Sequence, residues 1–342
     1  MRIFVTGGAG YIGSHTCLEL LNAGFDVTVF DNFSNSQRES LIRVEQIAGR
    51  RLSVIEGDIR NGLALEQALR DSGASAVVHF AGLKAVGHSV RHPLAYYDHN
   101  VLGSMRLLEA MAACDVHRLV FSSSATVYGE PMQLPLTEQH PLRATNPYGQ
   151  TKLIIEQMLR DLHASEPQRW RIGILRYFNP AGAHESGLIG EDPRGVPGNL
   201  MPFVAQVAIG RREQVQIWGG DYDTPDGTGV RDYVHVVDLS LGHLAALKRL
   251  DHEPGCWAVN LGTGCGNSVL EMVASFAAAS GQSIPYAMGP RRPGDVATCY
   301  ADATLAAEQL QWRAHRDLIT MCRDHWRWQK RNPQGYDGRL EE

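Results

Sequence analysis

Residues 5–13 read Val5-Thr6-Gly7-Gly8-Ala9-Gly10-Tyr11-Ile12-Gly13, and this stretch decides how the first half of the chain folds. Its glycines match two spacings, G-x-x-G-x-x-G and G-x-G-x-x-G. An apolar strand, Ile3–Thr6, precedes them, and apolar residues at helical spacing follow from Tyr11 to Ala23, where Gly24 supplies a helix end. Glycines in such a turn let the backbone approach a pyrophosphate, which lies on the positive N-terminus of the helix. The stretch therefore predicts a nucleotide-binding strand–turn–helix unit.

Five further apolar runs follow, each separated from the next by a segment long enough for a helix. Continuous apolar strands that alternate with helices are typical of βαβ units, in which helices cover both faces of a parallel sheet. Because crossovers between parallel strands are right-handed, the sequence predicts an α/β fold with a doubly wound parallel sheet. The additional predicted strands are Val27–Phe30, Leu52–Ile55, Ala76–Phe80, Leu119–Ser122 and Ile172–Leu175.

The chain changes character near residue 180. Between residues 179 and 229 glycine and proline are dense, which is typical of ordered loops over a site, with one helix predicted at Pro202–Ile209. Helical patterns return at Val237–Leu250 and Ser268–Ala279, whereas residues 285–342 look irregular. We therefore expect a Rossmann domain at 1–178, a return segment at about 230–262, and a smaller C-terminal α/β substrate domain at 179–342.

The composition excludes several classes of protein. The chain has 342 residues and a net charge of −5, and no block of Lys and Arg forms a phosphate-tracking stripe, so it does not suit a nucleic-acid binder. No stretch reaches about 18 apolar residues, so no membrane span is expected. The six cysteines include no C-x-x-C pair, and residues 2–6 show no signal peptide. We therefore expect a cytoplasmic protein without a metal site.

The choice of cofactor is indicated by Asp31, which follows the second predicted strand, 18 residues after Gly13. A carboxylate at this position accepts hydrogen bonds from ribose hydroxyls and repels a 2′-phosphate, so it favours NAD over NADP. An ordinary turn aspartate before Asn32 is the alternative interpretation. Asp58 follows the third strand and is a candidate for holding the adenine, although a structural aspartate is an equally good interpretation.

A second constellation is Tyr148-Gly149-Gln150-Thr151-Lys152. Its spacing places a phenol and an ammonium on one face of a helix, and Asn146-Pro147 just before it is a helix-start signal. A nearby cation is expected to lower the tyrosine pKa from about 10, which makes a general base for a sugar hydroxyl. The pair lies downstream of Ser122-Ser123-Ser124, at the sheet edge where doubly wound folds bind ligands. A surface helix pair without chemistry is the alternative.

These segments resemble the UDP-glucose 4-epimerase family of the extended short-chain dehydrogenase/reductases, and the resemblance covers essentially the whole chain. The C-terminal segments make it much more specific than the glycine-rich turn, which the wider superfamily shares. The segments that carry the resemblance are Val5–His15, His79–Gly87, Phe121–Gly129, Leu175–Pro180, Gly227–Tyr233 and Pro333–Tyr336.

The resemblance implies interconversion of UDP-galactose and UDP-glucose by inversion at C4, through a transient 4-keto sugar, with tightly bound NAD. It assigns catalysis to Tyr148, which takes the proton from the sugar O4, to Lys152, which holds the nicotinamide ribose, and to Ser124, which hydrogen-bonds O4. Because the keto sugar must turn over in its pocket, binding energy is expected to concentrate on the nucleotide diphosphate.

The resemblance also implies which residues hold NAD. His99 departs from the family pattern, since prominent relatives carry Asn there, and either His99 or the neighbouring Asn100 makes the contact near the nicotinamide ribose. The expected set is Gly7, Gly10, Tyr11, Ile12, Gly13, Asp31, Asn32, Phe33, Asn35, Ser36, Asp58, Ile59, Phe80, Ala81, Gly82, Lys84, Asn100, Ser122, Tyr148, Lys152 and Phe178.

The implied substrate is a UDP-hexose, whose diphosphate needs cations. Arg231 and Arg292 match family positions that contact it, and arginine suits bidentate phosphate recognition. The remaining expected substrate contacts, beside Ser124 and Tyr148, are Asn179, Asn199 and Leu200 for the sugar nucleotide, Asp295 near the uridine ribose, and Gln216, Ile217 and Trp218 beside the uracil.

Cys299 stands where family members restricted to plain hexoses tend to carry Tyr, and where members that accept N-acetylhexosamines carry a smaller residue. Removing a phenol ring makes room for an acetamido group. We therefore hypothesise that UDP-GalNAc and UDP-GlcNAc are interconverted as well. The alternative is that Cys299 is a small core residue and another side chain closes the space.

Other functions compete with this one. A 4,6-dehydratase needs an acid and a base directly after the active-site hydroxyl, whereas Ser124 is followed by Ala125-Thr126. A UDP-glucuronate epimerase or decarboxylase needs a cationic cradle for the C6 carboxylate. A non-catalytic NAD-binding module does not need Ser124, Tyr148 and Lys152 together. We also expect a homodimer through helices that include Tyr148, with residues 153–155 and 158–159 as a candidate face, although a buried core face explains this apolar run as well.

Overall fold

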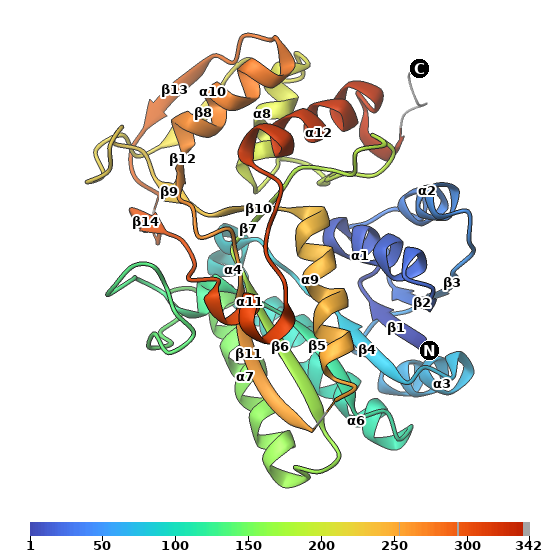
Figure 1. Ribbon diagram of the computed structural model, residues 1–342. Coiled ribbons are helices and arrows are strands. Elements are labelled where there is room, and N and C mark those ends of the chain that lie inside the picture. Colours follow the sequence, from blue (N-terminus) through green and yellow to red (C-terminus); the bar gives the residue numbers. More distant parts are fainter. Residues whose placement is uncertain (253, 293, 338–342) are drawn as a thin grey trace.

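A parallel sheet of seven strands forms the centre of the computed structural model, which describes residues 1–252, 254–292 and 294–337 (Figure 1). The strand order is β11-β6-β5-β4-β1-β2-β3. Successive strands first run outward from β1 through β2 to β3, and then continue on the other side of β1 from β4. This reversal is the switch point of a doubly wound sheet, so the predicted fold class is confirmed. The strands are β1 (Arg2–Thr6), β2 (Asp26–Asp31), β3 (Ser53–Glu56), β4 (Ala76–His79), β5 (Arg118–Ser124), β6 (Arg171–Tyr177) and β11 (Gly255–Leu261).

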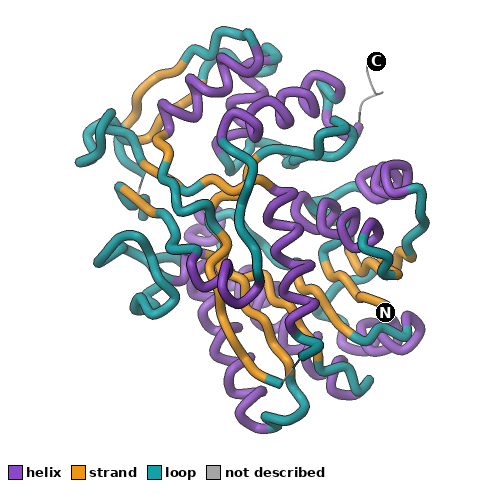
Figure 2. The backbone as a smooth tube through the Cα atoms, in the orientation of Figure 1, coloured by secondary structure: helices purple, strands orange, loops and turns teal. Residues whose placement is uncertain are grey.

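Helices cover both faces of this sheet, and each face has its own apolar core (Figure 2). Side chains of β1 alternate between the two cores, with Ile3 and Val5 in one and Phe4 in the other. The first core packs against α1 (Tyr11–Asn22), α2 (Arg38–Ala48), α9 (Val236–Arg249) and α11 (Thr304–Leu310). The second packs against α3 (Gly62–Ser72), α6 (Gly103–Ala113) and α7 (Pro147–Ser165).

A smaller unit from the C-terminal half lies above the carboxyl ends of the strands in the view of Figure 1. Its core joins Val204, Phe276 and Met321 from three helices. These helices are α8 (Leu200–Ala208), α10 (Val269–Ser280) and α12 (Leu318–Arg331). Short strand pairs complete the unit: β7 (Asn179–Ala181) with β10 (Tyr233–His235), β8 (Val215–Trp218) with β13 (Tyr286–Gly289), and β9 (Val230–Arg231) with both β12 (Asn267–Ser268) and β14 (Thr298–Cys299).

Local signals account for most helix positions. The Asn146 side chain accepts a hydrogen bond from the Gly149 N–H at 2.9 Å, and Pro147 begins α7, as the helix-start signal predicts. Ser268 and Glu271 form a reciprocal capping box at the start of α10. The helices predicted at Pro202–Ile209, Val237–Leu250 and Ser268–Ala279 correspond to α8, α9 and α10.

The prediction that residues 285–342 are irregular is wrong, because β13, β14, α11, α12 and a 3₁₀ turn at Gly335–Asp337 lie there. The buried face of α12 includes Asp324, His325 and Gln329 beside Met321 and Trp328. Polar residues on the buried face hide the apolar spacing that marks a helix. The end of the predicted substrate domain, residues 338–342, lies outside the described residues.

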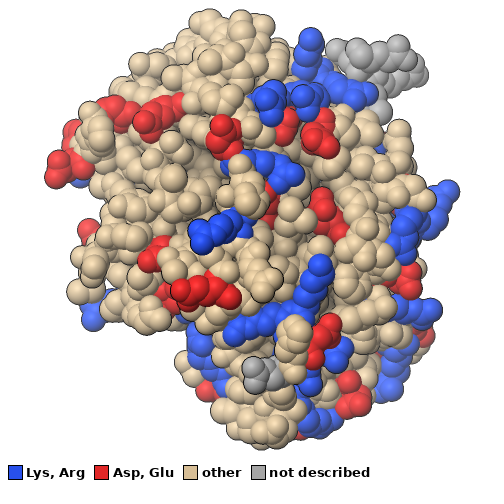
Figure 3. Space-filling view, viewed as in Figure 1, with Lys and Arg blue, Asp and Glu red and all other residues tan. Residues whose placement is uncertain are grey.

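Part of the expected return segment lies against the seven-stranded sheet, because α9 packs on it and β11 pairs with β6 at its edge, whereas β9 and β10 belong to the smaller unit. The domain bounds stay a prediction. No helix among the described residues is long and apolar enough to cross a membrane. Over the face in Figure 3, acidic and basic side chains are interspersed. The remaining short helices are α4 (Val86–Arg91), α5 (Pro93–Tyr96) and the π-helical turn Tyr97–Leu102, all after β4, and a 3₁₀ turn at Ala125–Val127 after β5.

Candidate active site

The glycine turn between β1 and α1 keeps its shape because two of its positions cannot hold a side chain. A Cβ on Gly13 would lie 2.3 Å from the Gly7 carbonyl oxygen, and a Cβ on Gly7 would lie 2.6 Å from the Ala81 nitrogen. Gly7 also has a φ of 70°. Gly10 precedes α1, and no side-chain hydrogen bond caps that helix end. The first backbone N–H groups of α1 therefore remain to bind an anion such as a pyrophosphate.

Asp31 ends β2 and fixes the loop that follows. Its Oδ2 accepts the Ala9 N–H at 3.0 Å, and its Oδ1 accepts the Phe33 N–H and the Ser36 hydroxyl, both at 2.9 Å. The carboxylate thereby joins the glycine turn to the loop that carries Asn32, Phe33, Asn35 and Ser36. A carboxylate offers about four acceptor positions, so Oδ2 keeps one for a ribose hydroxyl.

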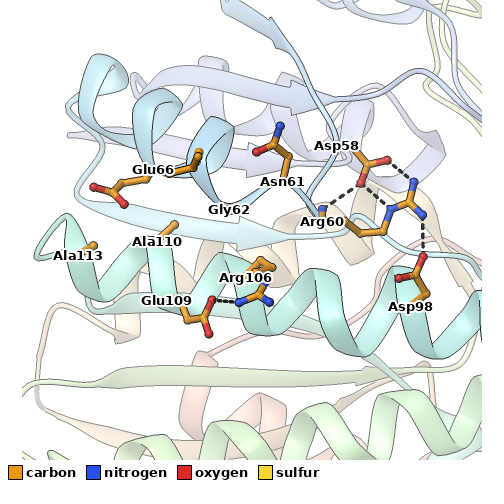
Figure 4. Close-up of a pocket in the computed structure, with 11 residues that line it drawn as sticks. Asp58, Arg60, Asn61, Gly62, Glu66, Asp98, Arg106, Glu109, Ala110 and Ala113 are labelled. Atoms are coloured by element: carbon orange, nitrogen blue, oxygen red, sulfur yellow. Dashed lines mark hydrogen bonds and ion pairs between the residues drawn. The ribbon is translucent and has the colours of Figure 1, made fainter.

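Asp58 lies nearby but is already engaged (Figure 4). Its Oδ1 accepts the backbone N–H and Nε–H of Arg60, and its Oδ2 accepts Arg60 and Asn32. Hydrogen bonds from Arg60 hold the pKa of Asp58 well below its usual range. Arg60 also pairs with Asp98 at 2.6 Å, beside an open groove of about 960 Å³ between α3 and α6. All acceptor positions of Asp58 are used, so an adenine would have to displace one of these bonds.

The loop after β4 forms the next wall and contains Phe80, Ala81, Gly82 and Lys84. Asn100 supports it from below: its Oδ1 accepts the Leu83 N–H at 2.7 Å, and its Nδ2 donates to the Leu83 carbonyl and the Thr151 hydroxyl, both at 3.0 Å. His99 Nδ1 lies 2.9 Å from the Ala95 carbonyl oxygen. Asn100 therefore holds the loop against α7, and contact of either residue with the cofactor stays a prediction.

The end of β5 and the first turns of α7 bring Ser124, Tyr148 and Lys152 together. Lys152 Nζ donates to the Ser122 carbonyl at 2.7 Å and lies 6.0 Å from the centre of the Tyr148 ring. The Ser124 hydroxyl hydrogen-bonds the phenol and accepts the Thr126 hydroxyl at 3.0 Å. All three side chains are buried. The sequence places two of them on one helical face, and the fold supplies the third from the neighbouring strand.

The predicted direction of the Tyr148 pKa shift is wrong for the protein without ligands. Burial raises the pKa of Tyr148 to about 12, and the Ser124 hydrogen bond offsets only part of this. Burial also lowers the pKa of Lys152 to about 8, against a smaller opposite effect of Glu156. The Lys152 ammonium lies over the Phe121 ring at 4.8 Å and donates to a carbonyl, so removal from water dominates both pKa values.

A cavity of about 470 Å³ opens in the smaller unit. Three arginines and one aspartate line it, which gives it a positive balance suited to a diphosphate. Among the described residues, the Arg231 guanidinium donates to the carbonyls of Val230 and Ala297, and Arg292 forms two hydrogen bonds with Asp295, at 3.0 and 3.1 Å. The predicted residues that line the cavity are Asn179, Asn199, Leu200, Gln216, Ile217, Trp218, Arg231, Arg292 and Asp295.

Sequence reasoning missed Arg212, the third arginine of this cavity. Its guanidinium lies 4.7 Å from the centre of the Phe203 ring and donates to Gln206 at 2.7 Å. The only sequence signal is the pair Arg211-Arg212 just beyond the predicted helix. Tyr222 and Tyr233 also line the cavity and were not predicted.

Cys299 is not among the lining residues. It pairs in register with Arg231 and packs with Phe178, Val127 and Leu136. Burial raises the pKa of its thiol to about 11, so the thiol is neutral at pH 7. Its side chain packs against this apolar cluster, which includes residues that follow β5 and β6. Its expected contact with the sugar therefore stays a prediction.

Comparisons with known proteins agree with this geometry. Residues 4–325 match the family model described as GDP-mannose 4,6 dehydratase. UDP-glucose 4-epimerase of Bacillus subtilis (strain 168) is 56% identical and covers 98% of this chain and 99% of its own, and the Homo sapiens UDP-glucose 4-epimerase is 56% identical over 98% of both.

Solved structures are also similar. The Bifidobacterium longum UDP-glucose 4-epimerase in complex with NAD+ and UDP superposes with a TM-score of 0.95 at 52% identity, and the match covers 98% of this chain and 100% of that one. The UDP-Glc/GlcNAc 4-epimerase of Campylobacter jejuni gives a TM-score of 0.83 at 35% identity over 96% of this chain and 99% of that one.

Proposed function

This chain belongs to the UDP-glucose 4-epimerases of the extended short-chain dehydrogenase/reductase family, and we propose that it interconverts UDP-galactose and UDP-glucose by inversion at C4. NAD is its cofactor. The observation that carries the proposal is the grouping of Ser124, Tyr148 and Lys152 at the carboxyl edge of a dinucleotide-binding sheet. The arginine-lined cavity begins at Asn179, two residues beyond Tyr177, the register partner of Ser124.

The residues present fit NAD. The glycine turn leaves the N-terminus of α1 open to a pyrophosphate, and Asp31 keeps an acceptor position for a ribose hydroxyl. When bound, NAD supplies the acceptor and donor for the C4 hydrogen, together with a positive ring charge that favours an ionised phenol. The reaction has no net oxidation, so the cofactor need not leave.

Tyr148 takes the proton from the C4 hydroxyl and returns it to O4 after the sugar has turned over. Ser124 hydrogen-bonds the phenol and orients O4, and Lys152 holds positive charge near the ring. Burial of these three side chains excludes water from the transient 4-keto sugar. The two proton transfers are the reverse of each other, whereas the configuration at C4 depends on which face of the keto sugar lies toward the cofactor.

The cavity explains how the sugar turns over without loss of the nucleotide. Arg231, Arg292 and Arg212 bind the diphosphate, and the β8 strand lies beside the uracil. Binding energy on the nucleotide leaves the hexose free to rotate. Of the alternatives, 4,6-dehydration needs an acid and a base directly after Ser124, and this chain has Ala125 and Thr126 there instead.

The finer substrate range follows from Cys299. Cys299 packs against the cluster that contains Phe178. We propose that this side chain, smaller than the Tyr of hexose-restricted relatives, allows an acetamido group at C2, so that UDP-GalNAc and UDP-GlcNAc are interconverted as well. Cys299→Tyr is expected to abolish the N-acetyl activity and to spare the hexose activity. Equal loss of both activities would show that the position supports packing alone.

A homodimer is the expected assembly, in the cytoplasm. Ile155 and Leu159 of the candidate face are buried in the core of the chain itself, which leaves the half-buried Ile154 and the exposed Met105 and Leu94 for a partner copy. Size exclusion with light scattering tests this assembly. A single species of the chain mass, 37.6 kDa, would contradict it.

The activity is tested with purified protein and no added NAD. We expect UDP-galactose to be converted to UDP-glucose, resolved by ion-pair chromatography, because the resident cofactor is regenerated in each cycle. Absence of conversion, also after addition of NAD, would contradict the proposed function.

A further inference from the structure

A buried carboxylate that sequence reasoning did not single out lies between the two halves of the site. Glu191, in the loop between β7 and α8, is 5% exposed. Its Oε1 accepts the Lys84 ammonium at 3.0 Å and the Asn199 amide nitrogen at 2.7 Å. Burying a carboxylate is costly unless it is paired and hydrogen-bonded, so these two contacts account for its presence here.

The two partners of Glu191 come from different units. Lys84 belongs to the loop after β4 in the sheet unit, on the cofactor side, and its Nζ lies 6.0 Å from the centre of the Tyr11 ring in the glycine turn. Asn199 immediately precedes α8 in the smaller unit and lines the substrate cavity. One carboxylate therefore connects the cofactor wall to the substrate wall.

The contact also fixes the direction of the Asn199 amide. A residue at this position usually caps its helix with its side chain, but Asn199 makes no cap hydrogen bond. Its Nδ2 donates to Glu191 instead, which leaves the Oδ1 acceptor for a ligand. In this orientation Asn199 suits a hydroxyl group of the substrate rather than a phosphate oxygen.

The same loop contacts the other end of the predicted NAD site. Arg194 donates to the carbonyls of Ser34 at 3.2 Å and Ser36 at 2.9 Å, in the loop after β2 that Asp31 fixes. Glu191 and Arg194 thus contact the two walls that are expected to enclose the cofactor. This arrangement resists opening of the site while substrate is exchanged.

We propose that Glu191 is a positioning residue for the reaction, which holds Lys84 toward the cofactor and orients the Asn199 amide toward the substrate. This inference rests on the proposed function, because it assumes that both ligands bind where that function needs them. Loss of Glu191 releases both side chains, so it weakens substrate binding and retention of NAD while the Tyr148 proton transfer stays intact.

The test uses the holoenzyme with Glu191→Ala and the isosteric Glu191→Gln, and Glu185→Gln as control, because Glu185 is an exposed glutamate of the same loop. Glu191→Ala is expected to raise KM for UDP-galactose, and the Kd of UDP in calorimetry, about tenfold, with kcat changed less than about threefold. Resident NAD, released by acid after desalting, is expected to be lost faster from Glu191→Ala and, through the weakened Lys84 contact, from Glu191→Gln. Glu185→Gln is expected to match the wild type in all three readouts.

A double-mutant cycle separates positioning from a general effect on packing. If Glu191 acts through Asn199, the KM of Glu191→Ala/Asn199→Ala equals that of Asn199→Ala, instead of the product of the two single effects. Multiplicative effects on KM, or unchanged KM and NAD retention in a folded Glu191→Gln and Glu191→Ala, would overturn the proposal. A wild-type protein that does not convert UDP-galactose would instead refute the proposed function on which it rests.

Discussion

The glycine turn and the arginine-lined cavity are built in opposite ways. The turn is one continuous stretch, Gly7–Gly13, and backbone atoms packed against backbone atoms determine its shape. The cavity is formed by side chains from segments spread between Asn179 and Asp295. A pyrophosphate is the same in every dinucleotide, so a rigid backbone cradle suffices for the cofactor. The sugar nucleotide is instead expected to bind to a wall of side chains, in which single substitutions change substrate binding without changing the fold.

The largest effect is expected at Tyr148 in α7, which lies outside the glycine turn and is not among the residues that line the cavity. Tyr148→Phe removes the group that exchanges the O4 proton and should lower kcat by about 10³-fold or more, while the protein still retains NAD and binds UDP. Steady-state kinetics with UDP-galactose and the acid-released NAD content give the two readouts. Near-normal kcat would favour the non-catalytic interpretation of the site.

Adding a methyl group to the glycine turn should disturb the cofactor-binding half of the site and leave the substrate cavity unchanged. Gly13→Ala places a Cβ against the Gly7 carbonyl oxygen and is expected to cost about 2–3 kcal/mol of unfolding free energy together with the resident NAD. Gly49→Ala is the matched control: Gly49 has a φ of 63° with no atom within 4 Å of the added Cβ, so only about 1 kcal/mol of backbone strain is expected. Denaturant titration and NAD content distinguish the two, and equal losses would contradict a tightly packed turn.

Removing a positive charge from the cavity should weaken substrate binding and leave NAD retention unchanged. Arg231→Met is expected to raise KM for UDP-galactose about 10- to 100-fold with NAD retained, because the charged hydrogen bonds to the diphosphate are lost. Arg212→Met should have a smaller effect, since Arg231, unlike Arg212, matches a family position that contacts the diphosphate. The reverse order of the two KM values would mean that the diphosphate lies nearer Arg212.

The smallest effect concerns Lys152 and the pH dependence of stability. Its pKa is about 8 in the folded protein and about 10.4 when unfolded, so between these values the unfolded chain binds more protons. The unfolding free energy of the wild type therefore increases relative to that of Lys152→Met as the pH rises from 8 toward 10.4. Thermal melts at pH 7 and pH 9.5 should show this as a change of a few degrees in the Tm difference. A Tm difference that is constant with pH would contradict the low Lys152 pKa.

Local sequence patterns predicted the regions whose structure depends on residues that are close together in the chain. The turn, six of the seven central strands and the helix start at Asn146-Pro147 follow from local spacing. The cavity residues were predicted through the family resemblance, because Arg231 or Asn199 alone carries no local signal. Glu191 was missed for the same reason, since its partner Lys84 belongs to the other unit. Arg212 was missed although its partners Phe203 and Gln206 are close in sequence, because no motif marks it.

The wrong predictions have a common physical cause. The spacing of Tyr148 and Lys152 gives the sign of their charge interaction but not the burial that outweighs it. The polar residues on the buried face of α12 find partners only in the folded protein, so their spacing does not resemble that of a core helix. Burial of polar groups is a property of the whole fold, and no short stretch of sequence reports it.

We expect the same hydrogen to leave C4 and to return to the other face of the sugar, a transfer for which bound NAD would supply the acceptor and donor. It is tested most directly with UDP-galactose that carries deuterium at C4, incubated in ordinary water without added NAD. We expect the product UDP-glucose to retain the deuterium at C4, as measured by mass spectrometry and NMR. Loss of the deuterium to solvent would contradict it, because inversion would then proceed by removal of a proton from carbon.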